Sequence, residues 1–152
     1  MPSDQTSARM SAILQGARLL KVARGKREQW SFAFDRADLS VGCLWRVTAG
    51  ERLAFTRDDQ GRNFGRPKPA NVETMAAELL VGRHVSSVES GAWAADLAIY
   101  LGAGLRLELL VDSASQEAWQ LNLDDAIFVG AGHRIHEVRQ SEPGVWAPIQ
   151  AR

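Results

Sequence analysis

The feature that most constrains this chain is a repetition within its own sequence, at an offset of 66 residues. Ten positions between residues 9 and 59 hold the same residue 66 positions later, where composition alone gives roughly three identities. A self-similar stretch of this length predicts two copies of one folding unit. The identities join Leu14, Gly16, Val22, Gly25, Ala37, Leu39, Leu44, Glu51, Asp58 and Asp59 to Leu80, Gly82, Val88, Gly91, Ala103, Leu105, Leu110, Glu117, Asp124 and Asp125.

Each copy is predicted to begin with a short helix, over residues 6–15 in the first copy and 72–81 in the second. Both helices run into a glycine, Gly16 or Gly82, the residue that most readily takes the left-handed conformation at a helix end. Asn71 precedes the second helix, where its side-chain oxygen can accept a hydrogen bond from a first-turn N–H.

Strands follow in each copy, because apolar side chains alternate with polar or small ones as in a strand with one buried face. The alternation covers residues 30–34, 39–47 and 53–55 in the first copy, and 97–101, 105–109 and 119–123 in the second. A further strand is predicted at 135–138. The fold class predicted is therefore α+β: two tandem similar units, each a short helix packed on an antiparallel β-meander.

The 152 residues have the length of a single domain, which we place over 1–152. The internal repeat occupies 6–59 and 72–125, with a linker at 60–71 and a C-terminal tail at 130–152. The linker is rich in glycine and proline and has almost no apolar residues, as is typical of a loop.

The protein is expected to be soluble and cytoplasmic. Its single cysteine, Cys43, lies in an apolar run and is interpreted as a small core residue in a reducing compartment. Residues 1–15 lack the basic start and long apolar run of a secretory signal, and no window is apolar enough to span a bilayer. We therefore predict no association with a membrane.

The net charge is zero, but the charges are unevenly distributed. Residues 1–76 hold 13 Lys and Arg against 8 Asp and Glu, and residues 77–152 hold 5 against 10. Such a dipole can steer a charged partner, or it can be neutralised within the fold; both interpretations stay open. Two basic clusters, 18–27 and 57–68, lie in the first half, but no nucleic-acid-binding motif accompanies them and the pI of 6.8 argues against that ligand.

Three groups of residues have the chemistry of a catalytic or metal site. His133, His136 and Glu137 are plausible zinc ligands, but the histidines lack the i, i+4 spacing of the helical His-Glu-x-x-His motif. On a strand, positions 133 and 136 would point to opposite faces. The pairs Asp58–Asp59 and Asp124–Asp125 could hold a cation, yet aspartate at a strand end is an ordinary turn residue. We interpret all of them as surface or turn residues, and predict no metal, no cofactor and no catalytic residue.

Five tryptophans divide into two groups. Trp30, Trp45 and Trp119 fall at strand positions whose parity matches the core. Trp93 lies in a predicted turn and Trp146 in the tail, where an exposed tryptophan often marks a contact surface. Packing of the loops is the alternative explanation for these two.

The strand end Trp45-Arg46-Val47, the strand start Asp96-Leu97 and the segment Glu117-Ala118-Trp119-Gln120-Leu121 resemble small uncharacterised bacterial proteins, some of which are of immunity-protein type. The resemblance covers residues 10–130 and rests on apolar positions. It implies a cytoplasmic, non-enzymatic protein and transfers no catalytic residue.

The function predicted from these observations is that of a non-enzymatic binding protein with a protein partner, in the form of an immunity protein that neutralises a toxin by direct binding. Its acidic second half would attract a basic partner. The alternatives are a small enzyme or ligand-binding protein with a cleft between the two halves, and a homodimer. The predicted contact residues are Trp93, Asp112, Glu117, Asp124 and Asp125.

Overall fold

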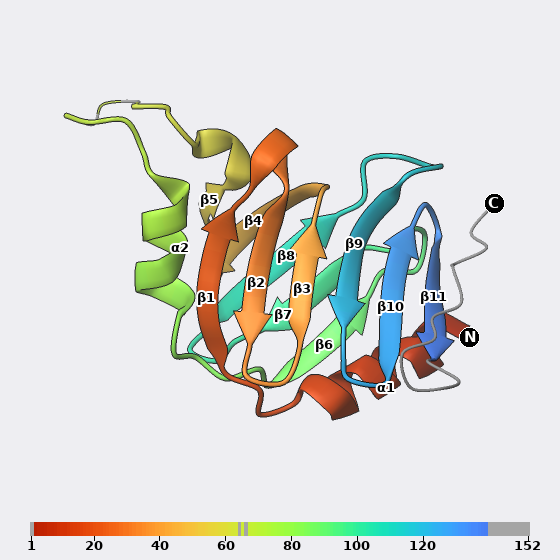
Figure 1. Cartoon of the computed structure of the whole chain (residues 1–152). Coiled ribbons are helices and arrows are strands. Elements are labelled where there is room, and N and C mark those ends of the chain that lie inside the picture. Colours follow the sequence, from red (N-terminus) through yellow and green to blue (C-terminus); the bar gives the residue numbers. More distant parts are fainter. Residues whose placement is uncertain (1, 64, 66, 140–152) are drawn as a thin grey trace.

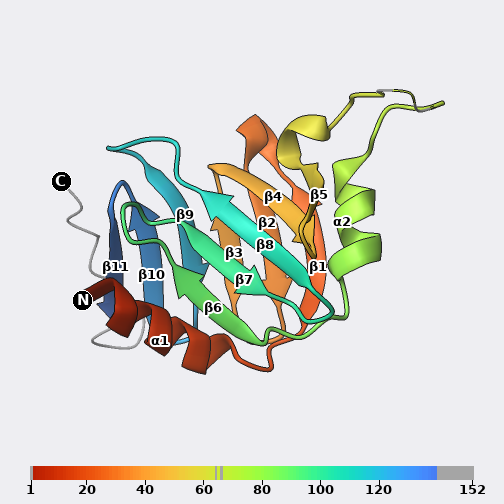
Figure 2. The same ribbon diagram turned by 180° about the vertical axis from the view of Figure 1, so that it is seen from behind.

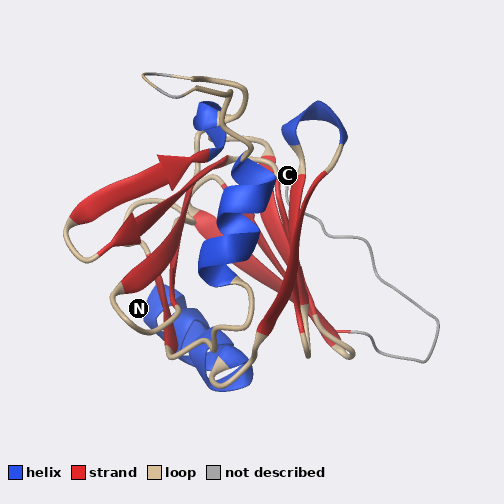
Figure 3. Cartoon of the chain, turned by 90° about the vertical axis from the view of Figure 1, so that its left-hand side faces the viewer, coloured by secondary structure: helices blue, strands red, loops and turns tan. Residues whose placement is uncertain are grey.

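The protein folds as two antiparallel β-sheets that face each other, with a helix along each of two open sides (Figures 1 and 3). The description rests on a computed structural model and covers residues 2–63, 65 and 67–139, without the side chains of residues 2–4 and 139. The coarse prediction of an α+β fold with antiparallel sheets is confirmed. Among the described residues, neither helix has the length and apolarity needed to cross a bilayer.

Eleven strands form the sheets of the described chain. The six-stranded sheet has the order β1-β2-β3-β9-β10-β11, and the five-stranded sheet has the order β5-β4-β8-β7-β6. The helices are α1 (Pro2–Leu14) and α2 (Val72–Leu80), and single 3-10 turns are η1 (Lys26–Glu28) and η2 (Arg57–Asp59). The strands are β1 (Leu19–Arg24), β2 (Trp30–Phe34), β3 (Asp38–Val41), β4 (Leu44–Ala49), β5 (Arg52–Thr56), β6 (Ser87–Ser90), β7 (Leu97–Tyr100), β8 (Leu105–Leu110), β9 (Glu117–Asn122), β10 (Ala126–Ala131) and β11 (Arg134–Arg139).

The strands of each half are divided between the two sheets. The first half contributes β1-β2-β3 to the six-stranded sheet and β4-β5 to the five-stranded sheet, whereas the second half contributes β6-β7-β8 to the five-stranded sheet and β9-β10 to the other. The halves meet where β3 pairs with β9 and where β4 pairs with β8. The prediction that each unit keeps its own meander is therefore not confirmed, because strands of the two halves are hydrogen-bonded to each other in both sheets.

The predicted strand at 39–47 is wrong as a single strand. The chain leaves the six-stranded sheet after Val41 and enters the five-stranded sheet at Leu44. At the crossing, the backbone N–H groups of Gly42 and Cys43 both donate to the carbonyl oxygen of Ala118, at 2.8 and 3.2 Å. The alternation of apolar residues continues through the crossing because both sheets turn their apolar faces to one core.

Each helix covers the sheet edge of the other half. Helix α1 packs against β6 and touches β11, and α2 packs against β1, so the two helices lie on opposite sides of the sandwich (Figures 2 and 3). Helix side chains satisfy the edge backbone: the N–H of Ser90 donates to Ser7 Oγ at 3.2 Å, and the N–H of Arg24 donates to Glu73 Oε2 at 3.2 Å. The prediction that each helix packs on the meander of its own copy is thus wrong, because each helix packs on a strand of the other half.

Backbone hydrogen bonds at the contact of the two halves occur in pairs that the 66-residue offset relates. The N–H of Gly16 donates to Val85 O while the N–H of Gly82 donates to Leu19 O, both at 2.8 Å. Gly16 and Gly82 have φ values of +85° and +93°, as predicted for glycines at helix ends. The predicted Asn71 cap is confirmed, because its side chain accepts from the Thr74 N–H at 3.1 Å.

Tryptophans join the two sheets in the core. Trp30 of β2 meets Trp45 of β4 edge to face, with ring centroids 4.9 Å apart, and Phe32 and Phe55 pack on Trp45 at 5.1 and 6.2 Å. Such contacts stabilise a core beyond the area they bury. The prediction that Trp30, Trp45 and Trp119 are core residues is confirmed, since all three are buried.

The charge difference between the halves is partly neutralised by ion pairs across them. Arg9, Arg46 and Arg57 of the first half pair with Glu137, Glu108 and Asp112 of the second. Arg106 also pairs with Glu108, at 3.0 Å, so Glu108 of β8 is held between arginines of β4 and β8.

Candidate functional site

Trp93 is the most exposed large apolar side chain among the described residues. Its exposed fraction is 91%, against 59% for Leu53, the next in order. It stands on the loop 91–96 between β6 and β7, as the sequence predicted. An indole in water costs free energy that a binding partner would recover, which is why tryptophan is enriched in interface hot spots.

The loop that carries Trp93 is held at several points. The N–H of Ala95 donates to Gly132 O at 2.9 Å, and the N–H of Gly91 donates to Asp96 O at 2.9 Å. The carbonyl oxygen of Ala95 accepts from the indole N–H of buried Trp119 at 2.7 Å. Trp93 is therefore presented on an ordered loop, so little conformational entropy would be lost on binding.

Two further loops pack beside it. The turn 131–134 approaches the loop 111–116 so closely that a Cβ at Gly132 would lie 2.5 Å from the carbonyl oxygen of Ala114. The N–H of Val111 donates to Asp96 Oδ1 at 2.7 Å. We call the surface formed by residues 91–96, 111–116 and 131–134 the three-loop surface.

The three-loop surface contains an open depression of about 470 Å³. Trp93, Asp112, Ser113 and His133 are among its lining residues. The side chain of Asp112 is 55% exposed, and its ion pair with Arg57 is loose at 3.8 Å. Two of the five predicted contact residues, Trp93 and Asp112, are thus brought together.

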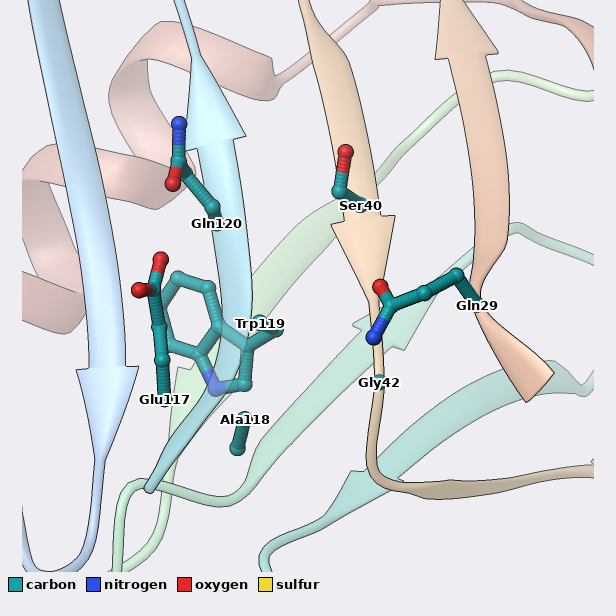
Figure 4. Close-up of a pocket in the computed structure, with 7 residues that line it drawn as sticks. All are labelled: Gln29, Ser40, Gly42, Glu117, Ala118, Trp119 and Gln120. Carbon is teal, nitrogen blue, oxygen red and sulfur yellow. The ribbon is translucent and has the colours of Figure 1, made fainter. Parts of the chain in front are cut away.

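Glu117 lies in a neighbouring depression of about 260 Å³, on the outer face of the six-stranded sheet. Figure 4 shows it with the amides of Gln29 and Gln120 and the hydroxyl of Ser40. Gln29 lies against Gly42, where a Cβ would be 2.5 Å from its Nε2. Glu117 is reached through the same loop 111–116 that carries Asp112, so the two carboxylates are at the same end of the sandwich.

Asp124 and Asp125 are at the other end. They occupy the turn between β9 and β10, whereas Glu117 begins β9, so a six-residue strand of roughly 20 Å separates them. They line a depression of about 310 Å³ with Arg9, Arg36 and Glu137. The structure therefore places the five predicted contact residues on two separate surfaces, and cations accompany the carboxylates of the second.

The residues weighed as metal ligands do not converge. Within the described part of the chain, no three His, Cys, Asp or Glu side chains come close enough to hold an ion. Asp59 belongs to a capping box with Thr56, whose N–H donates to Asp59 Oδ2 at 2.9 Å, so the turn interpretation of this pair is confirmed. Asp58 and Asp59 follow β5 of the five-stranded sheet, whereas Asp124 and Asp125 lie between β9 and β10 of the six-stranded sheet.

Cys43 is a core residue, as predicted. Its exposed fraction is 1%, and burial, with a smaller contribution from Asp112, raises its pKa to about 12. A thiol with such a pKa stays protonated at neutral pH and is a poor nucleophile.

The sequence did not predict that two further residues, Trp119 and Arg57, contribute to the site. Trp119 was assigned only to the core, although its indole N–H holds the Trp93 loop. Arg57 was counted in a basic cluster, yet it is largely buried and donates to Gly42 O at 3.2 Å. No local sequence signal distinguishes these roles, because both depend on contacts between residues far apart in the chain.

No family model matches the chain, and no curated protein or solved structure is significantly similar to it.

Proposed function

We propose that this chain is a non-enzymatic binding protein that contacts a protein partner through the three-loop surface. The observation that carries the proposal is Trp93, which is 91% exposed on a loop fixed by hydrogen bonds at Gly91 and Ala95. A large aromatic side chain presented rigidly beside a depression has the properties of an interface hot spot.

We also infer that the two halves are copies of one unit that exchange strands. The paired hydrogen bonds of Gly16 and Gly82 and the matching strand orders of the two sheets support this. The copies differ most between their third and fourth strands: residues 42–43 join β3 to β4, whereas residues 111–116 join β8 to β9. The longer connection lies in the three-loop surface, so the departure from the repeat coincides with the proposed contact surface.

The form of binding that we propose is that of an immunity protein, which neutralises a toxin by covering its functional surface. The acidic side chains of Asp112 and Glu117 at the end of the sandwich that bears Trp93 support a basic partner, because complementary charge speeds association. Asp124 and Asp125 are secondary candidates, since Arg9 and Arg36 lie in the same depression.

The proposal is tested with random dodecapeptides displayed on phage and selected on the wild-type protein. The best binders are synthesised, and their dissociation constants are measured by fluorescence anisotropy on wild type, Trp93→Ala and Leu53→Ala. Loss of a tryptophan hot spot should weaken binding about 30-fold, equivalent to roughly 2 kcal/mol. Leu53 is the matched control, because it is exposed on β5, at the edge of the five-stranded sheet opposite β6.

Binders that keep their affinity for Trp93→Ala would overturn the proposal, as would a selection that enriches no binder at all. Thermal unfolding of both variants checks that the fold is intact. Little change is expected, since each replaced side chain is largely exposed.

A further inference from the structure

We propose that the depression beside Trp93 receives the cationic end of an arginine or lysine side chain of the partner, between the indole face of Trp93 and the carboxylate of Asp112. The inference rests on the proposed function and specifies the chemistry of the partner. An extended basic side chain has an apolar stem and a charged end, and the depression has matching parts.

The first part is the indole ring. Tryptophan has the most favourable aromatic face for a cation, and Trp93 lines the depression while remaining almost wholly exposed. In the described structure its ring takes part in neither the aromatic pairs nor the cation–π contact, which involve other residues. The face of the ring is therefore available to an incoming group.

The second part is the carboxylate of Asp112, whose oxygens remain accessible to a ligand. Asp96, its neighbour, uses Oδ1 to accept from the N–H of Val111 at 2.7 Å. Asp112, in contrast, is 55% exposed, and Arg57 lies 3.8 Å away, beyond the distance of a good hydrogen bond. The lone pairs of Asp112 can accept from a guanidinium in the bidentate geometry that arginine favours.

The charges around the depression favour a cation over an anion. Asp112 faces the depression, and Glu117 lies at the same end of the sandwich. Arg57, the cation paired with Asp112, is largely buried and also faces Asp58 at 3.5 Å. Arg134 is directed at His133, with its Nε donating to His133 Nε2 at 3.2 Å. A carboxylate ligand would meet Asp112 directly, whereas a guanidinium would be attracted to it.

The apolar stem of the side chain would lie over the floor of the depression. Val111 and Ala114 line it next to Asp112, and burial of methylene groups there adds to affinity. Arginine is expected to bind better than lysine, because its planar group can stack on the indole and pair with the carboxylate at once.

The experiment uses two capped amino acids that differ in charge but have nearly the same shape: N-acetyl-argininamide and N-acetyl-citrullinamide. Each is titrated into ¹⁵N-labelled protein, and the indole N–H signal of Trp93, assigned from its disappearance in Trp93→Phe, is followed. The arginine probe should shift this signal saturably, and the citrulline probe should bind at least about fivefold more weakly. Asp112→Asn should remove most of this difference.

The matched control is Asp35→Asn, in the turn between β2 and β3, because this exposed aspartate is also held in a loose ion pair, 3.5 Å from Arg36. It should leave the preference for arginine unchanged. Equal binding of the two probes, or an arginine preference that survives Asp112→Asn, would overturn the inference.

Failure of the inference and failure of the proposed function give different results. Selected dodecapeptides that need Trp93 but are not enriched in arginine or lysine would leave the proposed function standing and reject the cationic ligand. Peptides that bind without Trp93 would reject the proposed function itself.

Discussion

The indole N–H of Trp119 donates to the carbonyl oxygen of Ala95 at 2.7 Å. Trp119 is buried in the core on β9, and Ala95 belongs to the loop that carries Trp93. One hydrogen bond therefore connects the packing of the six-stranded sheet to the surface proposed for binding. Trp119 is a positioning residue, because it acts on the surface through Ala95.

Trp119→Phe should loosen the loop and weaken binding without removing any contact with the partner. The substitution leaves the buried carbonyl of Ala95 without its donor, which costs about 1–3 kcal/mol of folding free energy. Hydrogen exchange at the loop amides 91–96 should accelerate, and the arginine probe should bind Trp93 more weakly.

Trp45→Phe is the control for that prediction. Trp45 is also buried, but its Nε1 has no hydrogen-bond partner among the described residues. It should lose packing while leaving the exchange of loop 91–96 unchanged. Equal acceleration in both variants would show that the loop responds to general destabilisation and not to the Trp119 bond.

Gly130 should not tolerate even one methyl group. It pairs with Trp119 across β9 and β10, and a Cβ at this position would lie 2.2 Å from the indole. Gly130→Ala must push the ring aside, so we expect a loss of about 1–3 kcal/mol of unfolding free energy, measured by chemical denaturation.

Gly82→Ala is the control, because it should destabilise the protein through backbone strain and not through a steric clash. Nothing lies within 4 Å of a Cβ at Gly82, but its φ is +93°, so the cost there is backbone strain of about 1 kcal/mol. Only Gly130→Ala should also disturb the Trp93 loop. An unchanged Trp93 indole signal in Gly130→Ala would contradict the proposed link through Trp119.

Cys43 should lower the stability of the protein at high pH. Burial raises its folded pKa from 9.0 to about 12. Below pH 9 the thiol is protonated in both states and contributes nothing to pH dependence. Above pH 9 the unfolded chain releases the proton and the native protein retains it, so the native state loses up to about 1.4 kcal/mol per pH unit.

The measurement is the unfolding free energy of wild type and Cys43→Ala between pH 8 and pH 10.5, expressed as the difference between them. Other groups titrate in both proteins and cancel. The wild type should lose stability relative to the variant as pH rises, and native Cys43 should resist iodoacetamide at pH 8 until the protein is unfolded. A constant difference would contradict the prediction.

The sequence predicted local features of the fold well and its topology poorly. Strand β2, the Asn71 cap and the left-handed glycines depend on neighbouring residues, and all three were identified. The break between Val41 and Leu44 could not be seen, because residues on both sides of it point into one core. A period of two reports burial on one face and carries no information about which sheet a strand joins.

For the same reason, the sequence repeat misaligned the last two strands of each copy. The 66-residue offset pairs β5 with β9, whereas the strand orders pair β4 with β9 and β5 with β10. Strand β10 was missed because it is buried on both sides and lacks alternation. At the site, Trp93 and Asp112 were identified by residue type, but their separation from Asp124 and Asp125 depends on the course of β9 and the turns at its ends.

The protection of the β6 edge by α1 should depend on two serines of the helix. Ser7 Oγ donates to Val88 O at 3.0 Å and accepts from the Ser90 N–H at 3.2 Å, and Ser11 Oγ accepts from the Val88 N–H at 3.1 Å. These hydroxyls form hydrogen bonds with backbone groups of β6 that could otherwise pair with another strand.

Replacing both serines by alanine should therefore cost about 1–3 kcal/mol and also promote self-association through β6. Light scattering against concentration would detect the association, and hydrogen exchange at Val88 and Ser90 would locate the open edge. Ser31→Ala, on the exposed face of β2, should change neither. A double variant that loses stability but stays monomeric would show that packing of α1 against β6 protects the edge without the hydroxyls.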